Sequence, residues 1–184
     1  MIDKLSIDNK LGDLIKNVSI LEGLKNISIH DLKKSPKDQW SIFYGLQISI
    51  QIVIDIGNHI LAELKESRIE EYADVIDKLG ERQIIPEDFA RRIRGITGLR
   101  NLLVHEYGVI RIEKIYDMLQ NNLSDFTEFH DYIQDYITEG LFAQIIIMIS
   151  ISFYFLISQS GIYFLNIPSS LLSGTLSMDK RYLG

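Results

Sequence analysis

The chain has 184 residues, no cysteine, four histidines and a formal net charge of -6 at pH 7. This length fits one domain with an appendage and is enough to bury a core without disulfides or metal. The lack of cysteine excludes a disulfide framework, a thiolate nucleophile and a Cys-ligated zinc site, and the acidic balance argues against a protein that wraps long nucleic acid. The first twenty residues are charged and amphipathic, with no apolar signal sequence, so we expect a cytoplasmic protein.

The first half of the sequence predicts three helices. Apolar residues recur at helical spacing over residues 11–21 and predict the first. Residues 35–38 read Ser-Pro-Lys-Asp, which is a start signal with a serine N-cap and a proline at the first helical position. The second helix is expected to follow this signal over about residues 40–65. A short third helix is expected from Tyr72 to about Gly80, where glycine favours a helix end.

The second half predicts two longer helices. Pro86 opens a fourth helix, which carries a polar motif and is expected to end near Gly108. A fifth helix is expected over about residues 112–137. Its inward-facing side chains are predicted to be Ile115, Leu119, Leu123, Phe126, Phe129 and Ile133. Short connections and the lack of an alternating strand pattern predict an all-α fold, an antiparallel helical bundle of about five helices over residues 1–139.

An apolar extension follows the predicted bundle over residues 140–184. Residues 140–178 contain no charged side chain, and the 27 residues 141–167 are mainly Ile, Phe, Leu, Tyr and Ser. This stretch is longer than the ~18–20 apolar residues that cross a bilayer. Four interpretations stay open: a membrane anchor, a buried sixth helix, a partner-binding helix, or a tail foreign to the ancestral domain. Several serines, and the lack of a Trp or basic residue at its start, weaken the membrane interpretation.

One segment of the fourth helix gathers residues capable of chemistry. Residues 100–107 read Arg-Asn-Leu-Leu-Val-His-Glu-Tyr. On a helical wheel Arg100 falls on a mostly apolar stripe, where an unpaired guanidinium would be costly. It therefore needs an anionic partner, either a carboxylate or a bound phosphate. Asp55, among isoleucines on the second helix, is the candidate carboxylate: it either pairs with Arg100 to fix helix register or orients Arg100 or His105 within a cleft.

The spacing within this motif suggests that two copies of the chain complete one site. Arg100 and His105 are about 140° apart on an ideal helix, so a single straight helix does not easily aim both at one phosphate. A dimer would supply two arginines and two histidines, with histidine as acid and base and arginine on the phosphate. This combination describes a ribonuclease that uses neither metal nor cofactor, with the RNA 2′-hydroxyl as nucleophile.

A local group of arginines lies beside the motif in this acidic chain. Arg91, Arg92 and Arg94 precede Arg100, and Arg91 and Arg94 are candidates for RNA phosphate binding. The alternative is that these arginines form a solvated face. The remaining histidines carry weaker expectations: His30 in a loop and His130 on the outside of the fifth helix are expected to be solvated. His59 is expected to be a satisfied polar group or a residue supporting the site.

Two segments resemble the HEPN-domain toxins of the HepT-like family: residues 99–107 and residues 54–60, within a similarity covering about residues 5–138. The resemblance implies a HEPN fold, a homodimer formed through the motif-bearing helices, and ribonuclease activity in a composite cleft. It assigns catalysis to Arg100 and His105, with Asn101 in support. The sequence departs from the family pattern at Arg111, where an acidic residue is expected.

The resemblance also implies a partner, a cognate minimal nucleotidyltransferase that acts as antitoxin. Such an antitoxin transfers AMP from ATP to the motif tyrosine, here Tyr107, and thereby places a negative phosphodiester near Arg100. The sequence therefore predicts the ribonuclease toxin of a toxin–antitoxin pair. The alternative is a non-catalytic HEPN-like module that binds nucleotide or docks a nucleotidyltransferase, in which Arg100 and His105 serve the structure.

Overall fold

The computed structural model describes residues 3–66, 69–105 and 111–159, and these residues form helices without any strand. The helices are α1 (Lys4–Gly23), α2 (Ile29–Lys34), α3 (Pro36–Glu63), α4 (Tyr72–Glu81), α5 (Glu87–Ile93), α6 (Ile96–His105), α7 (Ile112–Asn121) and α8 (Leu123–Gln159). The predicted all-α class is confirmed. The chain divides into two compact units, residues 1–134 and 135–184, so the domain boundary predicted at residue 139 lies inside the second unit.

Helix starts in the N-terminal part follow the expected capping chemistry. The Ser35 hydroxyl accepts a hydrogen bond from the backbone N–H of Asp38 at 3.3 Å, and Pro36 is the first residue of α3, as its sequence predicted. The short helix α2 was not predicted. It begins in the same way, with the Ser28 hydroxyl accepting from the N–H of Asp31 at 3.1 Å. His30 therefore lies on a helix rather than in a loop, and it is exposed.

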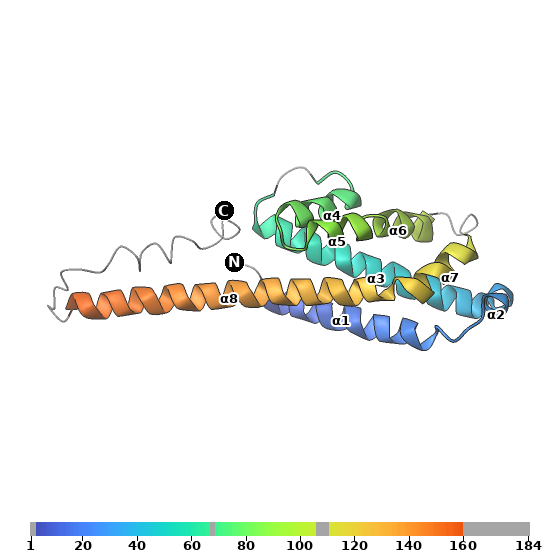
Figure 1. Ribbon diagram of the computed structural model, residues 1–184, viewed down its shortest axis with the longest axis horizontal. Coiled ribbons are helices and arrows are strands. Elements are labelled where there is room, and N and C mark those ends of the chain that lie inside the picture. The colour runs from blue at the N-terminus through green and yellow to red at the C-terminus, as the bar shows by residue number, and fades with distance from the viewer. Residues whose placement is uncertain (1–2, 67–68, 106–110, 160–184) are drawn as a thin grey trace. The chain divides into compact units, whose positions relative to one another are not determined.

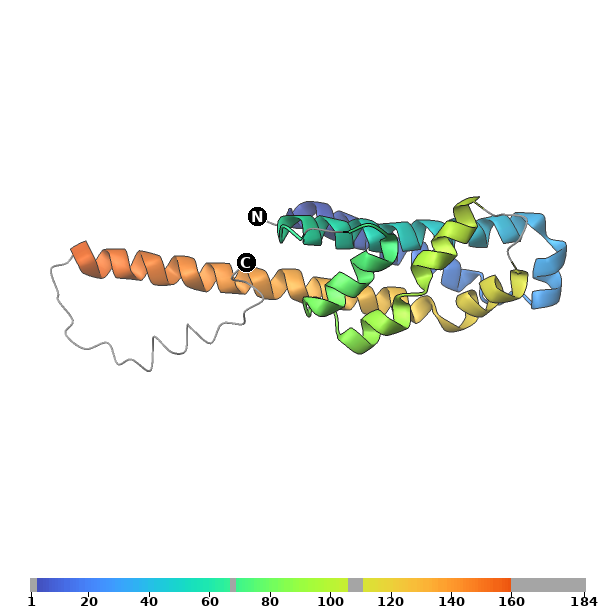
Figure 2. The same ribbon diagram turned by 90° about the horizontal axis from the view of Figure 1, so that it is seen from above.

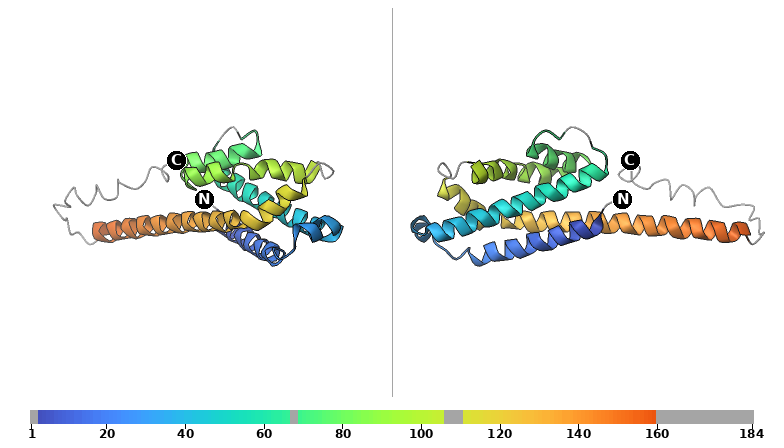
Figure 3. Two further views of the ribbon diagram at one scale, coloured as in Figure 1. Left: turned by 45° about the vertical axis from the view of Figure 1, so that its right-hand side comes forward. Right: turned by 180° about the vertical axis from the view of Figure 1, so that it is seen from behind.

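Helix α3 is the central element of the first unit. It lies between α1 on one side and α4, α5 and α6 on the other (Figure 1), and the view from behind in Figure 3 shows the same arrangement. Helix α3 is long and apolar enough to cross a membrane, but 56% of its most apolar 18-residue stretch is buried inside the unit. Its apolar composition is thus explained by its place in the core.

A close approach between α3 and α4 depends on one glycine. A Cβ added at Gly57 would overlap the Val75 side chain and lie 3.1 Å from Cδ1 of Leu79. Val75 and Leu79 are fully buried on α4. Gly57 therefore allows the two helix backbones to pack together more closely than any larger residue would.

The predicted fourth helix is two helices. Helices α5 and α6 are separated at Arg94 and Gly95, and Figure 2 shows the change of direction there. The Thr97 hydroxyl donates to the carbonyl of Arg94 at 3.0 Å and satisfies a group that the break leaves without a helical partner. The sequence predicted one unbroken helix from Pro86, and this prediction is corrected by the break between α5 and α6.

The predicted fifth helix is also divided. Helix α7 ends at Asn121 and α8 begins at Leu123. The six residues predicted to face inward are nevertheless all buried: Ile115, Leu119, Leu123, Phe126, Phe129 and Ile133. The hydrophobic pattern thus identified the buried residues, although it did not reveal the break. The expected end of the fourth helix near Gly108 falls outside the described residues.

Candidate active site

Arg100 is held on α6 by one neutral side chain and one aromatic ring. Its Nε donates a hydrogen bond to Oε1 of Gln51 at 3.1 Å, and its guanidinium carbon lies 4.9 Å from the centroid of the Tyr72 ring. Its neighbours Leu99 and Leu103 are buried, whereas Arg100 itself is half-buried. The guanidinium is thus less enclosed than its wheel position predicted, and a cation over an aromatic face is favourable in such a setting.

Of the two interpretations of Asp55, the direct pair with Arg100 is wrong. Oδ1 of Asp55 accepts from Nε2 of Gln51 at 2.8 Å, and Oδ2 accepts from Nζ of Lys10 at 3.2 Å. Gln51 lies one turn before Asp55 on α3, so its amide reaches both the carboxylate and Arg100. Lys10, Asp55, Gln51 and Arg100 form one chain of hydrogen bonds from α1 through α3 to α6, in which Gln51 links Asp55 to Arg100.

This chain of hydrogen bonds leaves part of the Arg100 guanidinium available to bind another group. Among the described residues, Nε is the only Arg100 nitrogen that hydrogen-bonds a side chain, and neither Gln51 nor Tyr72 carries a charge that neutralises it. A planar guanidinium has five N–H donors in a fork that matches phosphate geometry. Arg100 is therefore oriented but not neutralised, which suits the binding of an anion.

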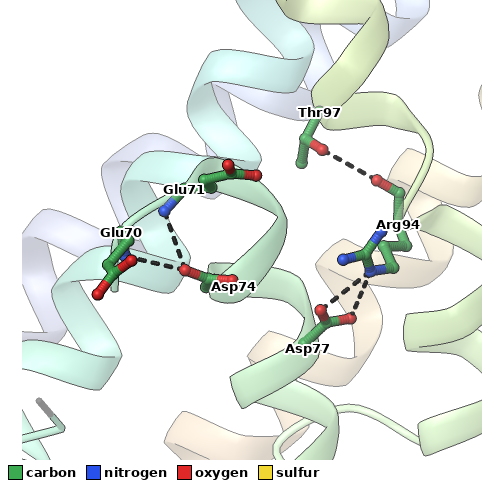
Figure 4. A network of polar contacts seen from close by, with 6 residues as sticks. All are labelled: Glu70, Glu71, Asp74, Asp77, Arg94 and Thr97. Carbon is green, nitrogen blue, oxygen red and sulfur yellow. Dashed lines mark hydrogen bonds and ion pairs between the residues drawn. The ribbon is translucent and has the colours of Figure 1, made fainter. Parts of the chain in front are cut away.

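The other arginines near the motif are already paired with carboxylates. Arg91 pairs with Glu87 at 3.4 Å, and Nε of Arg94 lies 2.9 Å from both carboxylate oxygens of Asp77 (Figure 4). The guanidinium of Arg92 contacts two carboxylates, those of Asp125 and Glu128. Each of these three arginines thus has a carboxylate partner, which distinguishes them from Arg100, and RNA binding by Arg91 and Arg94 stays a prediction.

A cavity of about 820 Å³ opens next to the Tyr72–Arg100 contact. It is lined by Asn58 of α3, residues 69–73 at the start of α4, Arg94 and Gly95 at the α5–α6 break, and Thr97, Gly98 and Asn101 of α6. Its lining includes amides and carboxylates as well as the Tyr72 ring. A Cβ added at Gly95 or Gly98 would meet no atom within 4 Å, so both glycines face open space. Asn101, predicted to support the site, is exposed and lines this cavity.

One ionised carboxylate fixes the backbone along the cavity wall. Oδ2 of Asp74 accepts hydrogen bonds from the backbone N–H groups of Glu71 at 2.9 Å and Glu70 at 2.8 Å, as Figure 4 shows. These two bonds, that from Glu71 first, hold the pKa of Asp74 below its ordinary value. Asp74 is therefore an anion at neutral pH and orders the segment that contributes Glu70 and Glu71 to the cavity.

The predicted site residues are only partly covered by the structure. His105 is the last residue of α6, but its side chain and all of Tyr107 lie outside the described residues. Their roles stay predictions. His59 is half-buried, and its Nε2 has no hydrogen-bond partner among the described residues, while His130 contacts Asp131 at 2.8 Å. Over residues 3–66, 69–105 and 111–159, no group of three or more His, Asp or Glu side chains is close enough to hold a metal ion.

Three residues of the site were missed by sequence analysis. Gln51 was detectable in principle, because it precedes Asp55 by four residues and so shares its helix face. Lys10 and Tyr72 were not, because they are brought to α3 and α6 from distant parts of the chain. Their contacts depend on tertiary packing.

Comparison with known proteins identifies the first unit. The family model described as ribonuclease HepT-like matches residues 14–133. The chain is 29% identical over 136 residues to the tRNA nuclease HepT of Aphanizomenon flos-aquae, covering 74% of this chain and 92% of that protein. It is 28% identical over 96 residues to the mRNA nuclease HepT of Shewanella oneidensis, covering 52% of this chain and 72% of that protein.

Solved structures share the same fold at low sequence identity. YutE of Bacillus subtilis, a cytosolic protein of unknown function, gives a TM-score of 0.68 at 16% identity and covers 76% of this chain and 94% of its own. The tri-AMPylated HEPN toxin of Shewanella oneidensis, solved in complex with an MNT antitoxin, gives 0.64 at 24% identity, covering 70% of this chain and 96% of its own. These similarities establish the helical fold, and the family match extends over most of the first unit: this chain belongs to the ribonuclease HepT-like family.

Proposed function

We propose that this ribonuclease is the toxin of a toxin–antitoxin pair and cleaves RNA internally without a metal, using Arg100 to bind the scissile phosphate. The observation that carries the proposal is the state of Arg100. Gln51 and Tyr72 orient its guanidinium without neutralising it, whereas Arg91, Arg92 and Arg94 are each engaged by carboxylates. The relatives named as tRNA and mRNA nucleases support RNA as the substrate class.

The proposed reaction is a transfer within the RNA itself. A base removes the proton from the 2′-hydroxyl, its oxygen attacks phosphorus, and the bond from phosphorus to the 5′-oxygen breaks. The leaving oxygen takes a proton, and the products are a 2′,3′-cyclic phosphate and a 5′-hydroxyl. Arg100 binds the phosphate oxygens and stabilises the charge that grows on them, while His105 supplies acid and base chemistry.

A homodimer formed through the motif-bearing helices is part of the proposal. Within one helix, a five-residue separation directs Arg100 and His105 about 140° apart. Two copies of α6 facing each other bring an arginine of one chain near the histidine of the other. The site is then composite, and it forms in the cytoplasm, where RNA is present.

The cavity beside Arg100 is the proposed place for a neighbouring nucleotide. Its volume of about 820 Å³ falls within the range typical of small-ligand sites. The Asn58 and Asn101 amides and the Glu70 and Glu71 carboxylates offer both donors and acceptors to a base edge. Asn101 thus supports the site by contacting the substrate strand, and Arg94 contributes to the cavity wall rather than to free charge.

We further propose regulation by a cognate minimal nucleotidyltransferase that adds AMP to Tyr107. The HEPN toxin of Shewanella oneidensis, which is similar in fold, is tri-AMPylated and bound to an MNT antitoxin, and this supports the proposal. Tyr107 follows Arg100 by seven residues, which is two turns on a continued helix. A phosphodiester attached there competes with RNA for Arg100.

The test is cleavage of total RNA by the purified full-length protein in EDTA. Wild type and Arg91→Ala are expected to cleave, because Arg91 is exposed and paired with Glu87. Arg100→Ala and His105→Ala are expected to lose cleavage while they stay folded and dimeric, and Arg100→Ala is expected to unfold at a somewhat lower temperature because it loses the contacts with Gln51 and Tyr72. If wild type is folded and dimeric but cuts nothing, the catalytic proposal is wrong and a nucleotide-binding module replaces it.

A further inference from the structure

The second unit exposes a continuous apolar surface. Over residues 142–154 of α8, nine large apolar side chains are 43–73% exposed. They are Phe142, Ile145, Ile146, Ile147, Met148, Ile149, Ile151, Phe153 and Tyr154. The two long apolar helices of the described residues differ in burial: 56% of the most apolar 18-residue stretch is buried in α3, but only 13% in α8. Within the second unit, these apolar side chains are therefore not covered by other described residues of that unit.

The apolar surface surrounds the helix rather than forming a stripe. The five consecutive residues 145–149 are all large, apolar and exposed, and five residues cover more than one full turn. A helix that binds one partner helix or groove needs only one apolar face, and its other face is polar. A helix that is apolar all round is instead suited to surroundings that are apolar on every side.

One polar side chain in the middle of this segment is satisfied within the helix. The Ser150 hydroxyl donates to the backbone carbonyl of Ile146 at 2.8 Å, one turn earlier. A serine bonded in this way carries no unpaired donor into an apolar solvent. Ser150, one of the serines that weaken a membrane interpretation at the level of sequence, is therefore compatible with lipid.

Length and charge fit a bilayer. Residues 142–159 of α8 span roughly 27 Å at 1.5 Å per residue, close to a hydrocarbon thickness of about 30 Å. Charged residues bracket the segment, with Glu139 before it and Asp179 after it, and no charge lies between them.

The segment is also additional to the ribonuclease fold. The family match ends at residue 133, and the similar structures cover 94–96% of their own length with only 70–76% of this chain. The RNase family fold therefore does not explain why residues 142–159 are apolar.

We propose that residues 142–159 of α8 span a lipid bilayer and attach this ribonuclease to a membrane. The occupant of the apolar surface is lipid, on all sides of the helix. The inference is independent of catalysis, because none of its observations involves Arg100 or the cavity.

The first experiment uses the natural absence of cysteine. Ser152→Cys places a single thiol in the middle of the segment, and Ser124→Cys places one at an exposed position of the same helix within the first unit. Full-length protein is bound to neutral phosphatidylcholine vesicles, floated, and treated with a membrane-impermeant maleimide. The proposal predicts that both proteins float, that only Cys at position 124 is labelled, and that detergent with denaturant exposes position 152.

A second pair of variants tests insertion through its energetics. Each lysine near the centre of a spanning helix lowers insertion by roughly 100-fold. The variant Ile147→Lys/Ile151→Lys should therefore fail to float and be released by alkaline carbonate, whereas the matched Ile147→Leu/Ile151→Leu variant should behave as wild type. RNA cleavage and thermal unfolding of the first unit report that the lysine variant is folded.

Two results would overturn the proposal. Equal labelling of positions 124 and 152 on vesicles would place the segment outside the bilayer. Wild-type protein that stays in solution without detergent or lipid, with position 152 protected, would show that a second copy of the chain covers the surface instead.

Discussion

Gln51 should position Arg100, and its replacement by leucine tests this. Gln51→Leu keeps an apolar stem of similar size and removes both ends of the amide. The substitution breaks the 3.1 Å bond from Arg100 and the 2.8 Å bond to Asp55. Asp55 keeps Lys10 and Arg100 keeps the Tyr72 ring, so neither charge is left without any partner.

The expected stability cost follows from these two bonds. A hydrogen bond to a charged group contributes about 1.5–3 kcal/mol, and each should be discounted to about 1 kcal/mol or less, because Asp55 is 39% exposed and Arg100 is half-buried. The free energy of unfolding should therefore fall by about 1–2 kcal/mol, equivalent to a decrease in Tm of about 2–8 °C.

The expected catalytic cost is larger. Without Gln51 the guanidinium is held only by the Tyr72 ring, and a displacement of about 1 Å in a catalytic group costs on the order of 100-fold in rate. RNA cleavage in EDTA should fall 10- to 100-fold. The matched control is Gln47→Leu, a half-buried glutamine one turn earlier on α3 that is not part of the hydrogen-bonded chain described here.

Two outcomes separate positioning from a general loss of structure. A double-mutant cycle on unfolding free energy should give a coupling of about 1 kcal/mol between Gln51 and Arg100 and none between Gln47 and Arg100. If folded Gln51→Leu protein cleaves RNA at the wild-type rate, Gln51 does not position Arg100 for catalysis.

Three further predictions concern packing, pH and regulation. Gly57→Ala should lower the unfolding free energy by about 1–3 kcal/mol, because the new methyl group overlaps side chains of α4. Gly98→Ala should raise it by up to about 1 kcal/mol, because Gly98 faces open space on α6. Chemical denaturation measures both changes, and changes of the same sign would contradict the packing of α3 against α4. Asp74→Asn should lower stability at neutral pH. Because folding lowers the pKa of Asp74, its contribution to the free energy of unfolding is present above pH 3.8, its ordinary pKa, and disappears as pH falls through the depressed pKa. The unfolding free energies of wild type and Asp74→Asn should therefore converge in acid. A difference that stays constant with pH would be contrary evidence. Tyr107→Phe should keep cleavage but accept no AMP from the co-expressed nucleotidyltransferase, as intact mass would show; AMP transfer at an unchanged level would rule out Tyr107 as the acceptor.

The hydrophobic pattern predicted the bundle well because burial is periodic. The spacing of Leu11, Leu14, Val18 and Leu21 and the capped start at Ser35 correspond to α1 and α3 as observed. Helix breaks were less visible. Gly95 gave only a weak signal inside an apolar repeat, and the break at Asn122 had neither glycine nor proline beside it.

The partner of Arg100 was not predictable from the sequence alone. The helical wheel indicated that Arg100 needed an anionic partner, and Asp55 was the candidate carboxylate on the second predicted helix. In the structure Asp55 pairs with Lys10 instead. Arg100 contacts the neutral amide of Gln51 and the aromatic ring of Tyr72. These choices depend on how α1, α3, α4 and α6 pack, and short-range spacing carries little information on such contacts.

The chemical ends of the cleaved RNA show whether Arg100 takes part in cleavage without a metal. Full-length wild type and Arg100→Ala, both shown to be folded and dimeric at the assay temperature, are incubated with total RNA in EDTA, and the new termini are identified. We expect 2′,3′-cyclic phosphate and 5′-hydroxyl ends with wild type and no new ends with Arg100→Ala. Cleavage that continues in folded Arg100→Ala, or that appears only when a divalent metal is added, would contradict this expectation.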